Sequence, residues 1–315
     1  MSKSAKRFLS NNNVVLILLF IALYGSFFVN YFVTQQNITN IIVNVSVYGI
    51  ICIGMTFVLL TGAVDLSLGY QVALAAIVSV AISNATNPFL GAICAVVVCA
   101  MVGLINGLLV TKLKLNALIV TIAMMRILYG LCLFLCNDKQ IANTNPEFLN
   151  IFGAKLFGVV PVTIIYFTIC FFVVAFLLKK TPFGTSIYVV GGNAEAGHMS
   201  GINVDRVRTL GFVIASIFAA LGGIIIASRV GMGSSTLGEG LTLSCISSCV
   251  IGGIKITGGK GSVWHTLLGT LTIQTIINIM TLKVLSGWTQ TFVTGAVLVV
   301  VLIIDVLSKS KKSLY

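Results

Sequence analysis

Charged side chains are scarce in this sequence. Asp, Glu, Lys and Arg make up 8% of its 315 residues, and only seven residues are acidic. The two histidines, His198 and His265, stand far apart along the chain, and neither is interpreted as catalytic. All eight cysteines fall within apolar runs, without the polar ligands that usually complete a metal site. We therefore expect no catalytic residue, no metal site and no cofactor in this chain.

Apolar residues are abundant instead. They make up 58% of the chain, with a mean hydropathy of +1.10, above the roughly 45–50% of soluble proteins. Apolar runs of about twenty residues recur from end to end, which predicts an all-α, polytopic membrane protein with a single transmembrane domain over residues 1–315. We expect about ten spans. They are residues 14–33, 41–60, 70–83, 89–110, 115–136, 161–178, 209–228, 241–257, 263–280 and 288–306.

The positions of the basic residues predict an orientation. The formal net charge of +12 does not indicate a nucleic-acid partner, because the basic residues follow the ends of the apolar runs. With ten spans, one side of the bilayer receives most of them, including the basic start, the pair Lys179–Lys180 and the basic end. The positive-inside rule then places both termini in the cytoplasm. We expect a multi-pass membrane protein with both termini on the cytoplasmic side.

One polar segment, residues 188–208, interrupts the apolar pattern. The pair Gly191–Gly192 permits a sharp turn, Asn193 is a candidate N-cap, and Glu195 falls in the first helical turn. Gly201 is suited to end the helix. We expect a short helix over residues 194–200. Two interpretations stay open at this point, an ordinary loop between spans and a docking element for a cytoplasmic partner.

Several motifs resemble one family of transport proteins. Glu195-Ala196-Gly197-x-x-x-Gly201 resembles the Glu-Ala-Ala-x-x-x-Gly coupling helix of ABC importer permeases. The segments around it, Asp65-Leu66-Ser67-Leu68-Gly69, and Gly252-Gly253 followed by Gly258-Gly259-Lys260-Gly261-Ser262 resemble the ribose-type carbohydrate permeases. The resemblance covers roughly residues 40 to 306.

The resemblance implies the permease subunit of a bacterial ABC importer for a monosaccharide, located in the plasma (inner) membrane. Its partners would be a separate ATPase subunit, an extracytoplasmic sugar-binding protein and a second permease, which is either a second copy or a paralogue. The implied ATPase-coupling residues are Gly192, Asn193, Glu195, Ala196, Gly197, Gly201 and Ile202. The segment at Gly258 lacks the Gly-x-x-x-x-Gly-Lys-Ser/Thr spacing of a P-loop, so ATP hydrolysis is expected in the partner subunit.

The sequence departs from the family pattern at two places. Gly197 stands where the motif has Ala, and Ser244 stands where family members often have Asp. These changes leave the substrate open. A nucleoside, an autoinducer-type furanose or an amino acid are alternatives within the same importer class, and an ion-coupled secondary transporter is a more distant one.

An uncharged, hydroxyl-rich substrate needs hydrogen-bonding side chains along its pathway. The candidates are Asn44, Asp65, Ser67, Asn116, Arg126, Asn278, Trp288 and Gln290. Arg126 is the clearest charge within a span, where insertion costs about 2.5–3.5 kcal/mol. Polar side chains in membrane helices also hold neighbouring helices together, so helix packing stays the alternative role for these residues.

Two glycine-bounded segments, residues 62–69 and 252–259, alternate apolar and polar residues in a similar way. The similarity fits either a repeat of broken helices or chance. If the two segments lie close together, Asp65 and Lys255 are able to form an ion pair.

Overall fold

The computed structural model describes residues 13–156 and 160–312, and within them the protein is almost entirely helical. The long helices are α2 (Asn13–Phe28), α3 (Gln35–Leu60), α4 (Leu68–Ala85), α5 (Pro88–Thr111), α6 (Ala117–Cys136), α8 (Val162–Lys180), α11 (Val204–Val230), α13 (Val263–Leu282) and α14 (Gly287–Lys312). The shorter ones are α7 (Pro146–Gly153), α9 (Pro182–Gly192), α10 (Ala194–Met199), the 3₁₀ helix η1 (Ser235–Gly238) and α12 (Leu241–Gly252). The all-α membrane fold expected from the sequence is confirmed.

The number of spans is confirmed only in part. Six helices among the described residues are long and apolar enough to cross a membrane, namely α3, α4, α5, α6, α8 and α11. The other four predicted spans coincide with α2, α12, α13 and α14, so the total of ten stays a prediction. Two predicted ranges run too far, because residues 29–33 and 253–257 lie outside the helices.

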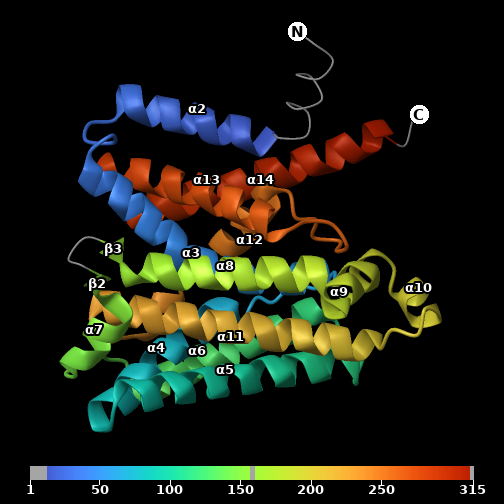
Figure 1. The fold of residues 1–315 in the computed structure, drawn as a ribbon, viewed down its shortest axis with the longest axis horizontal. Coiled ribbons are helices and arrows are strands. Elements are labelled where there is room, and N and C mark those ends of the chain that lie inside the picture. Colours follow the sequence, from blue (N-terminus) through green and yellow to red (C-terminus); the bar gives the residue numbers. More distant parts are fainter. Residues whose placement is uncertain (1–12, 157–159, 313–315) are drawn as a thin grey trace.

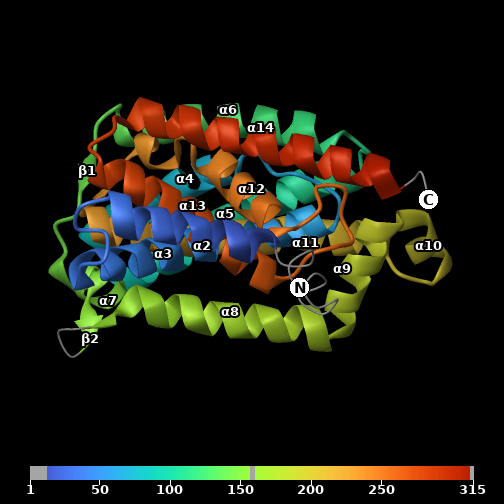
Figure 2. The same cartoon turned by 90° about the horizontal axis from the view of Figure 1, so that it is seen from above.

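Most of the long helices run along one axis of the molecule, and different elements gather at its two ends (Figure 1). At one end lie α7 and two short antiparallel pairs, β1 (Ile141–Ala142) with β4 (Met232–Gly233) and β2 (Lys155–Leu156) with β3 (Val160–Pro161). At the other end α9 and α10 project from the bundle, as both views show (Figures 1 and 2). The polar segment therefore occupies one tip of the molecule.

The core is built around α3 and α11. From Ile50 to Leu60 every residue of α3 is buried. Glycines let the neighbouring helices approach closely, because a Cβ atom on Gly223 would collide with the Val72 carbonyl and one on Gly103 with Phe212 and Ser216. Small residues at contacts are how helices pack in a bilayer, where apolar surface alone does not drive association.

The chain between α11 and α13 folds back into the bundle. After Gly231 (φ +77°), β4 and η1 lie along α4, so that Gly233 contacts Ala76 and Gly238 contacts Gly69. Helix α12 has only 12 residues, or about 18 Å at about 1.5 Å per residue, against a hydrocarbon core of about 30 Å. The helix predicted over 241–257 is therefore shorter than expected, because Gly253 (φ +109°) ends it early.

Candidate functional site

The polar segment forms a short helix that is capped at both ends. The Asn193 side-chain oxygen accepts hydrogen bonds from the backbone N–H groups of Glu195 and Ala196, both at 3.0 Å. At the other end Gly201 has φ +78°, and the Ile202 N–H donates to the Gly197 carbonyl at 3.0 Å. This last bond is the wide bond of a Schellman motif. The helix expected over 194–200 is present over 194–199.

One face of α10 is open to the surroundings. Glu195, His198 and Met199 are spaced to share a helix face, and all three are exposed, Met199 to 86%. Gly197 is buried on the opposite side, where its nearest neighbours are Val189 and Val190 of α9. The helix thus packs on α9 with one side and presents a mixed polar and apolar side outward.

Helix α9 contacts the core through the backbone atoms of glycine residues. We call Gly62, Gly191, Gly192, Gly258 and Gly259 the glycine junction. The Gly259 N–H donates to the Leu60 carbonyl, the last residue of α3, at 3.0 Å. A Cβ atom on Gly258 would lie 2.7 Å from the Gly191 oxygen and from the Gly62 nitrogen, and one on Gly259 would lie 2.6 Å from the Gly192 Cα. Three chain segments therefore touch with no side chain between them.

A side-chain hydrogen bond also connects α9 to the loop before α13. The Tyr188 hydroxyl of α9 donates to the Gly261 carbonyl at 3.0 Å. Gly258, Gly259 and Gly261 all have positive φ values, which other residues rarely adopt. The loop that leads into α13 is thus shaped to lie against α9, and a displacement of α9 bears directly on the end of α3 and on this loop.

The start of α11 is fixed next to the polar segment. Asn203 caps the helix by accepting from the Arg206 N–H at 2.9 Å. Lys112, just after α5, forms an ion pair with Asp205 at 3.3 Å. Both side chains are largely exposed, so the pair contributes about 0–1 kcal/mol.

The two glycine-bounded segments do approach each other, at Gly62 and Gly258. Asp65 is nevertheless not paired with Lys255. Its carboxylate accepts from the Ser67 N–H at 2.8 Å, the Ser67 hydroxyl at 2.6 Å and the Gln71 amide at 3.2 Å. All of these side chains are buried completely, so Asp65 and Ser67 reach no open pathway in this conformation.

Three other predicted pathway residues make packing or capping contacts. Asn44 accepts from the Arg229 guanidinium at 3.2 and 3.3 Å. Asn116 caps α6 by accepting from the Leu118 N–H at 2.8 Å. Asn278 exchanges two hydrogen bonds with Asn37, at 3.0 and 2.8 Å, and so joins α13 to α3.

Arg126 and Trp288 are exposed instead, and Gln290 is half-buried. Arg126 belongs to α6 and the other two to α14, and these helices run along the same side of the molecule (Figure 2). The one ion pair among the described residues joins Lys112 and Asp205, so Arg126 has no carboxylate partner within the part of the chain that the structure describes. The three residues thus belong to helices on one side of the molecule.

Part of that face is hollowed. Gln290 lines a pocket of about 210 Å³ together with Tyr48, Glu239, Ser244 and Ser247. Glu239 was missed as a pathway candidate, although an acidic residue before a serine-rich apolar run was a usable signal. Tyr48 carried no such signal, since it lies within an apolar run.

The comparisons with known proteins point to a single family. The family model described as "Branched-chain amino acid transport system / permease component" matches residues 37–302. The chain is 36% identical to the ribose import permease protein of Bacillus subtilis over 87% of this chain and 86% of that protein. It is 33% identical to the L-arabinose transport system permease protein of Escherichia coli (93% and 88% covered) and 31% identical to the autoinducer 2 import system permease protein of Yersinia pseudotuberculosis (95% and 86%). No solved structure matches significantly. The resemblance stated from the motifs is confirmed, and the chain belongs to this family of transport-system permease components.

Proposed function

We propose that the chain is the permease subunit of a bacterial ABC importer for a monosaccharide. The observation that carries the proposal is the geometry of α10, a doubly capped helix that projects at one tip of the molecule and is seated on α9. Similar proteins named for ribose and L-arabinose support a pentose-like sugar as the cargo. A polar, uncharged substrate of this kind also fits the Gln290 amide and the Ser244 and Ser247 hydroxyls, residues that line the pocket between α12 and α14.

In this proposal α10 docks on a separate ATPase subunit. Closure of the ATPase moves α10 and α9 together, because Gly197 packs on Val189 and Val190. The glycine junction passes this movement to the end of α3 and to the loop before α13, and the spans change between outward-open and inward-open arrangements. This chain contributes binding and movement, and the partner hydrolyses ATP.

The proposed sugar pathway runs along the face that carries Arg126, Trp288 and Gln290. Bare exposure of Arg126 to lipid would cost about 2.5–3.5 kcal/mol on insertion scales, so this face needs water or protein against it. A second permease, either another copy or a paralogue, would close the pathway from the opposite side. An extracytoplasmic binding protein would deliver the sugar at the end where α7 lies, and α10 and both termini would then lie in the cytoplasm.

Reconstitution tests the proposal. The chain is purified in mild detergent with the proteins that accompany it and placed in liposomes, and uptake of labelled ribose and L-arabinose is measured. We expect uptake that requires ATP, an ATPase subunit and a binding protein. Uptake by the chain alone, driven by a proton or sodium gradient, would instead establish a secondary transporter.

A further inference from the structure

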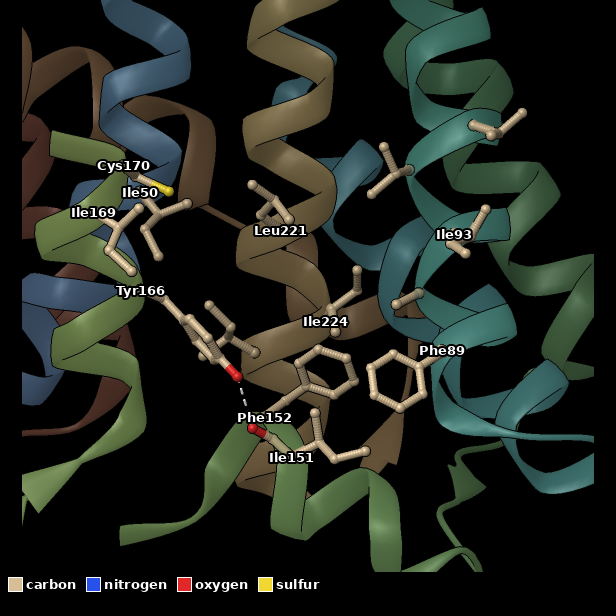
Figure 3. Close-up of a pocket in the computed structure, with 14 residues that line it drawn as sticks. Ile50, Phe89, Ile93, Ile151, Phe152, Tyr166, Ile169, Cys170, Leu221 and Ile224 are labelled. Atoms are coloured by element: carbon tan, nitrogen blue, oxygen red, sulfur yellow. Dashed lines mark hydrogen bonds between the residues drawn. The ribbon is translucent and has the colours of Figure 1, made fainter. Parts of the chain in front are cut away.

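An apolar hollow lies on the side of the molecule opposite the proposed pathway. It has a volume of about 430 Å³ and lies over α11, between α5 and α8 (Figure 3). Leu221 and Ile224 of α11 form its floor, and Ile151 and Phe152 of α7 close one end. Phe89 and Ile93 of α5 and Ile169 of α8 line its walls and are themselves exposed, so the hollow opens sideways.

Water is a poor occupant of this hollow. The hollow is large enough for several waters, but a buried water typically makes about three hydrogen bonds to polar groups. The lining offers only the Cys170 thiol, a weak partner, and the Tyr166 hydroxyl. That hydroxyl already donates to the Ile151 carbonyl at 2.9 Å. The hollow therefore favours an apolar occupant.

The surroundings of the opening identify the source of that occupant. Both α5 and α8 are long and apolar enough to cross a membrane. Their exposed apolar side chains continue from the hollow along each helix; they are Phe89, Ile93, Val97 and Met101 of α5, and Ile165, Ile169, Phe172 and Phe176 of α8. A hollow that opens between two such surfaces faces hydrocarbon, so its occupant comes from the bilayer.

The size of the hollow decides between a lipid chain and a helix of another protein. A helix about 10 Å across occupies roughly 120 Å³ per residue at about 1.5 Å rise, so 430 Å³ holds fewer than about four residues. That is little more than one turn. A thin, flexible acyl chain needs no such width and is able to follow the irregular floor.

We propose that this hollow is a binding site for an acyl chain of a membrane phospholipid, held between α5 and α8 on α11. The chain moves from one apolar environment to another, so the favourable contribution is close packing rather than removal from water. The contacts join α5, α7, α8 and α11, so a bound lipid braces these helices against one another. This site is independent of the proposed sugar pathway.

Photo-crosslinking tests the proposal. The protein is placed in nanodiscs of phosphatidylethanolamine and phosphatidylglycerol that contain a phosphatidylcholine with a diazirine near the end of one acyl chain. After illumination, crosslinked peptides are mapped by mass spectrometry. We expect strong enrichment at residues 89–97 and 166–170 over exposed apolar positions outside the hollow, such as Met101 and Phe176. Equal labelling inside and outside would overturn the proposal.

A pair of variants provides the control. Val96 lines the hollow, whereas Met101 is on the same helix outside it. Val96→Trp should fill the space and remove most of the crosslinking at residues 166–170, while Met101→Trp should leave it unchanged. If Val96→Trp does not fold, the milder Ala92→Leu replaces it. Native mass spectrometry should also show lipid retained by the unaltered protein and lost from the filled variant; equal retention by both would count against the site.

Discussion

At the scale of single residues, Gly197 and Gly201 of the polar segment differ in what their backbone requires. Gly197 lies within α10, and a Cβ atom there would meet Val189 and Val190 at 3.6 Å, an ordinary contact distance. Gly201 has φ +78° with nothing within 4 Å of an added Cβ. The first glycine is thus replaceable without a clash. The second is required by the conformation of the chain and not by lack of space.

Gly197→Ala should therefore stabilise the coupling segment. Alanine favours a helix interior over glycine by about 1 kcal/mol, and its methyl group would fill the contact with α9. We expect slower hydrogen exchange of the amides over residues 194–202, with uptake retained. Faster exchange in the variant would show that α10 does not pack on α9 as described.

Gly201→Val should destabilise the end of α10 and so reduce the coupling of transport to ATP hydrolysis. A β-branched residue at positive φ is strained by roughly 1–2 kcal/mol, so the Schellman bond between Ile202 and Gly197 should be lost. Insertion in the membrane should be unaffected, whereas the sugar transported per ATP hydrolysed should fall. Ser200→Ala is the matched control, because its hydroxyl bonds only to the Ala196 carbonyl within the same helix. Normal coupling in Gly201→Val would remove the docking role assigned to this helix.

Local features of this segment were predictable from the sequence, and distant ones were not. Asn193 and Gly201 act on backbone groups within a few residues, so their roles follow from spacing alone. Asn278 pairs with Asn37, 241 residues away, and no local pattern identifies that partner. The choice between a pathway role and a packing role depends on such distant contacts.

At the scale of elements, the glycine junction connects α9 to α3 and to the loop before α13. Gly191 and Gly192 are adjacent at the end of α9, but only Gly191 is enclosed. A Cβ atom on Gly191 would collide with the Leu60 carbonyl, whereas one on Gly192 would meet nothing within 4 Å. Comparing substitutions at Gly191 and Gly192 therefore separates the steric role of the glycine junction from the general cost of replacing a glycine.

Gly191→Ala should force α9 away from the end of α3, because the added carbon meets backbone that has no rotamer to change. We expect a lower melting temperature and a strong loss of ATP-dependent uptake. Gly192→Ala should change both little. The two are compared by thermal unfolding in detergent and by uptake in liposomes. Equal effects of the two substitutions would contradict the contact between α9 and α3.

Element boundaries were predictable where the hydropathy pattern is continuous. The predicted ranges for α5 and α13 differ from the structure by at most two residues at each end. The η1 segment was missed, because its run of Ser, Thr and Gly is typical of an exposed loop, and α12 is shorter than the span predicted over 241–257. The place of η1 along α4 depends on contacts such as Gly238 with Gly69, which allow two backbones to meet.

At the scale of the whole molecule, two opposite sides of the bundle have different chemistry. The side of α5 and α8 is apolar and contains the hollow, whereas the side of α6 and α14 carries Arg126, Gln290 and the pocket with Glu239 and Ser244. Hydropathy alone could not distinguish these sides, since α6 is nearly as apolar in sequence as α5. The difference depends on which residues the fold leaves exposed.

Arg126→Leu tests whether the side of α6 and α14 forms the sugar pathway. The substitution should give opposite results if Arg126 faces lipid and if it faces a pathway that contains water. If Arg126 faced lipid, leucine would remove an insertion cost of about 2.5–3.5 kcal/mol, so the protein would become more stable and uptake would stay the same. If Arg126 faces a sugar pathway that contains water, leucine removes a hydrogen-bond donor from it and adds little stability. We expect the second result, with reduced sugar uptake and unchanged binding of the ATPase. Ile127→Ala, which alters an exposed side chain next to Arg126 on α6, should leave uptake unchanged. Greater thermal stability of Arg126→Leu together with normal uptake would move the sugar pathway away from this side.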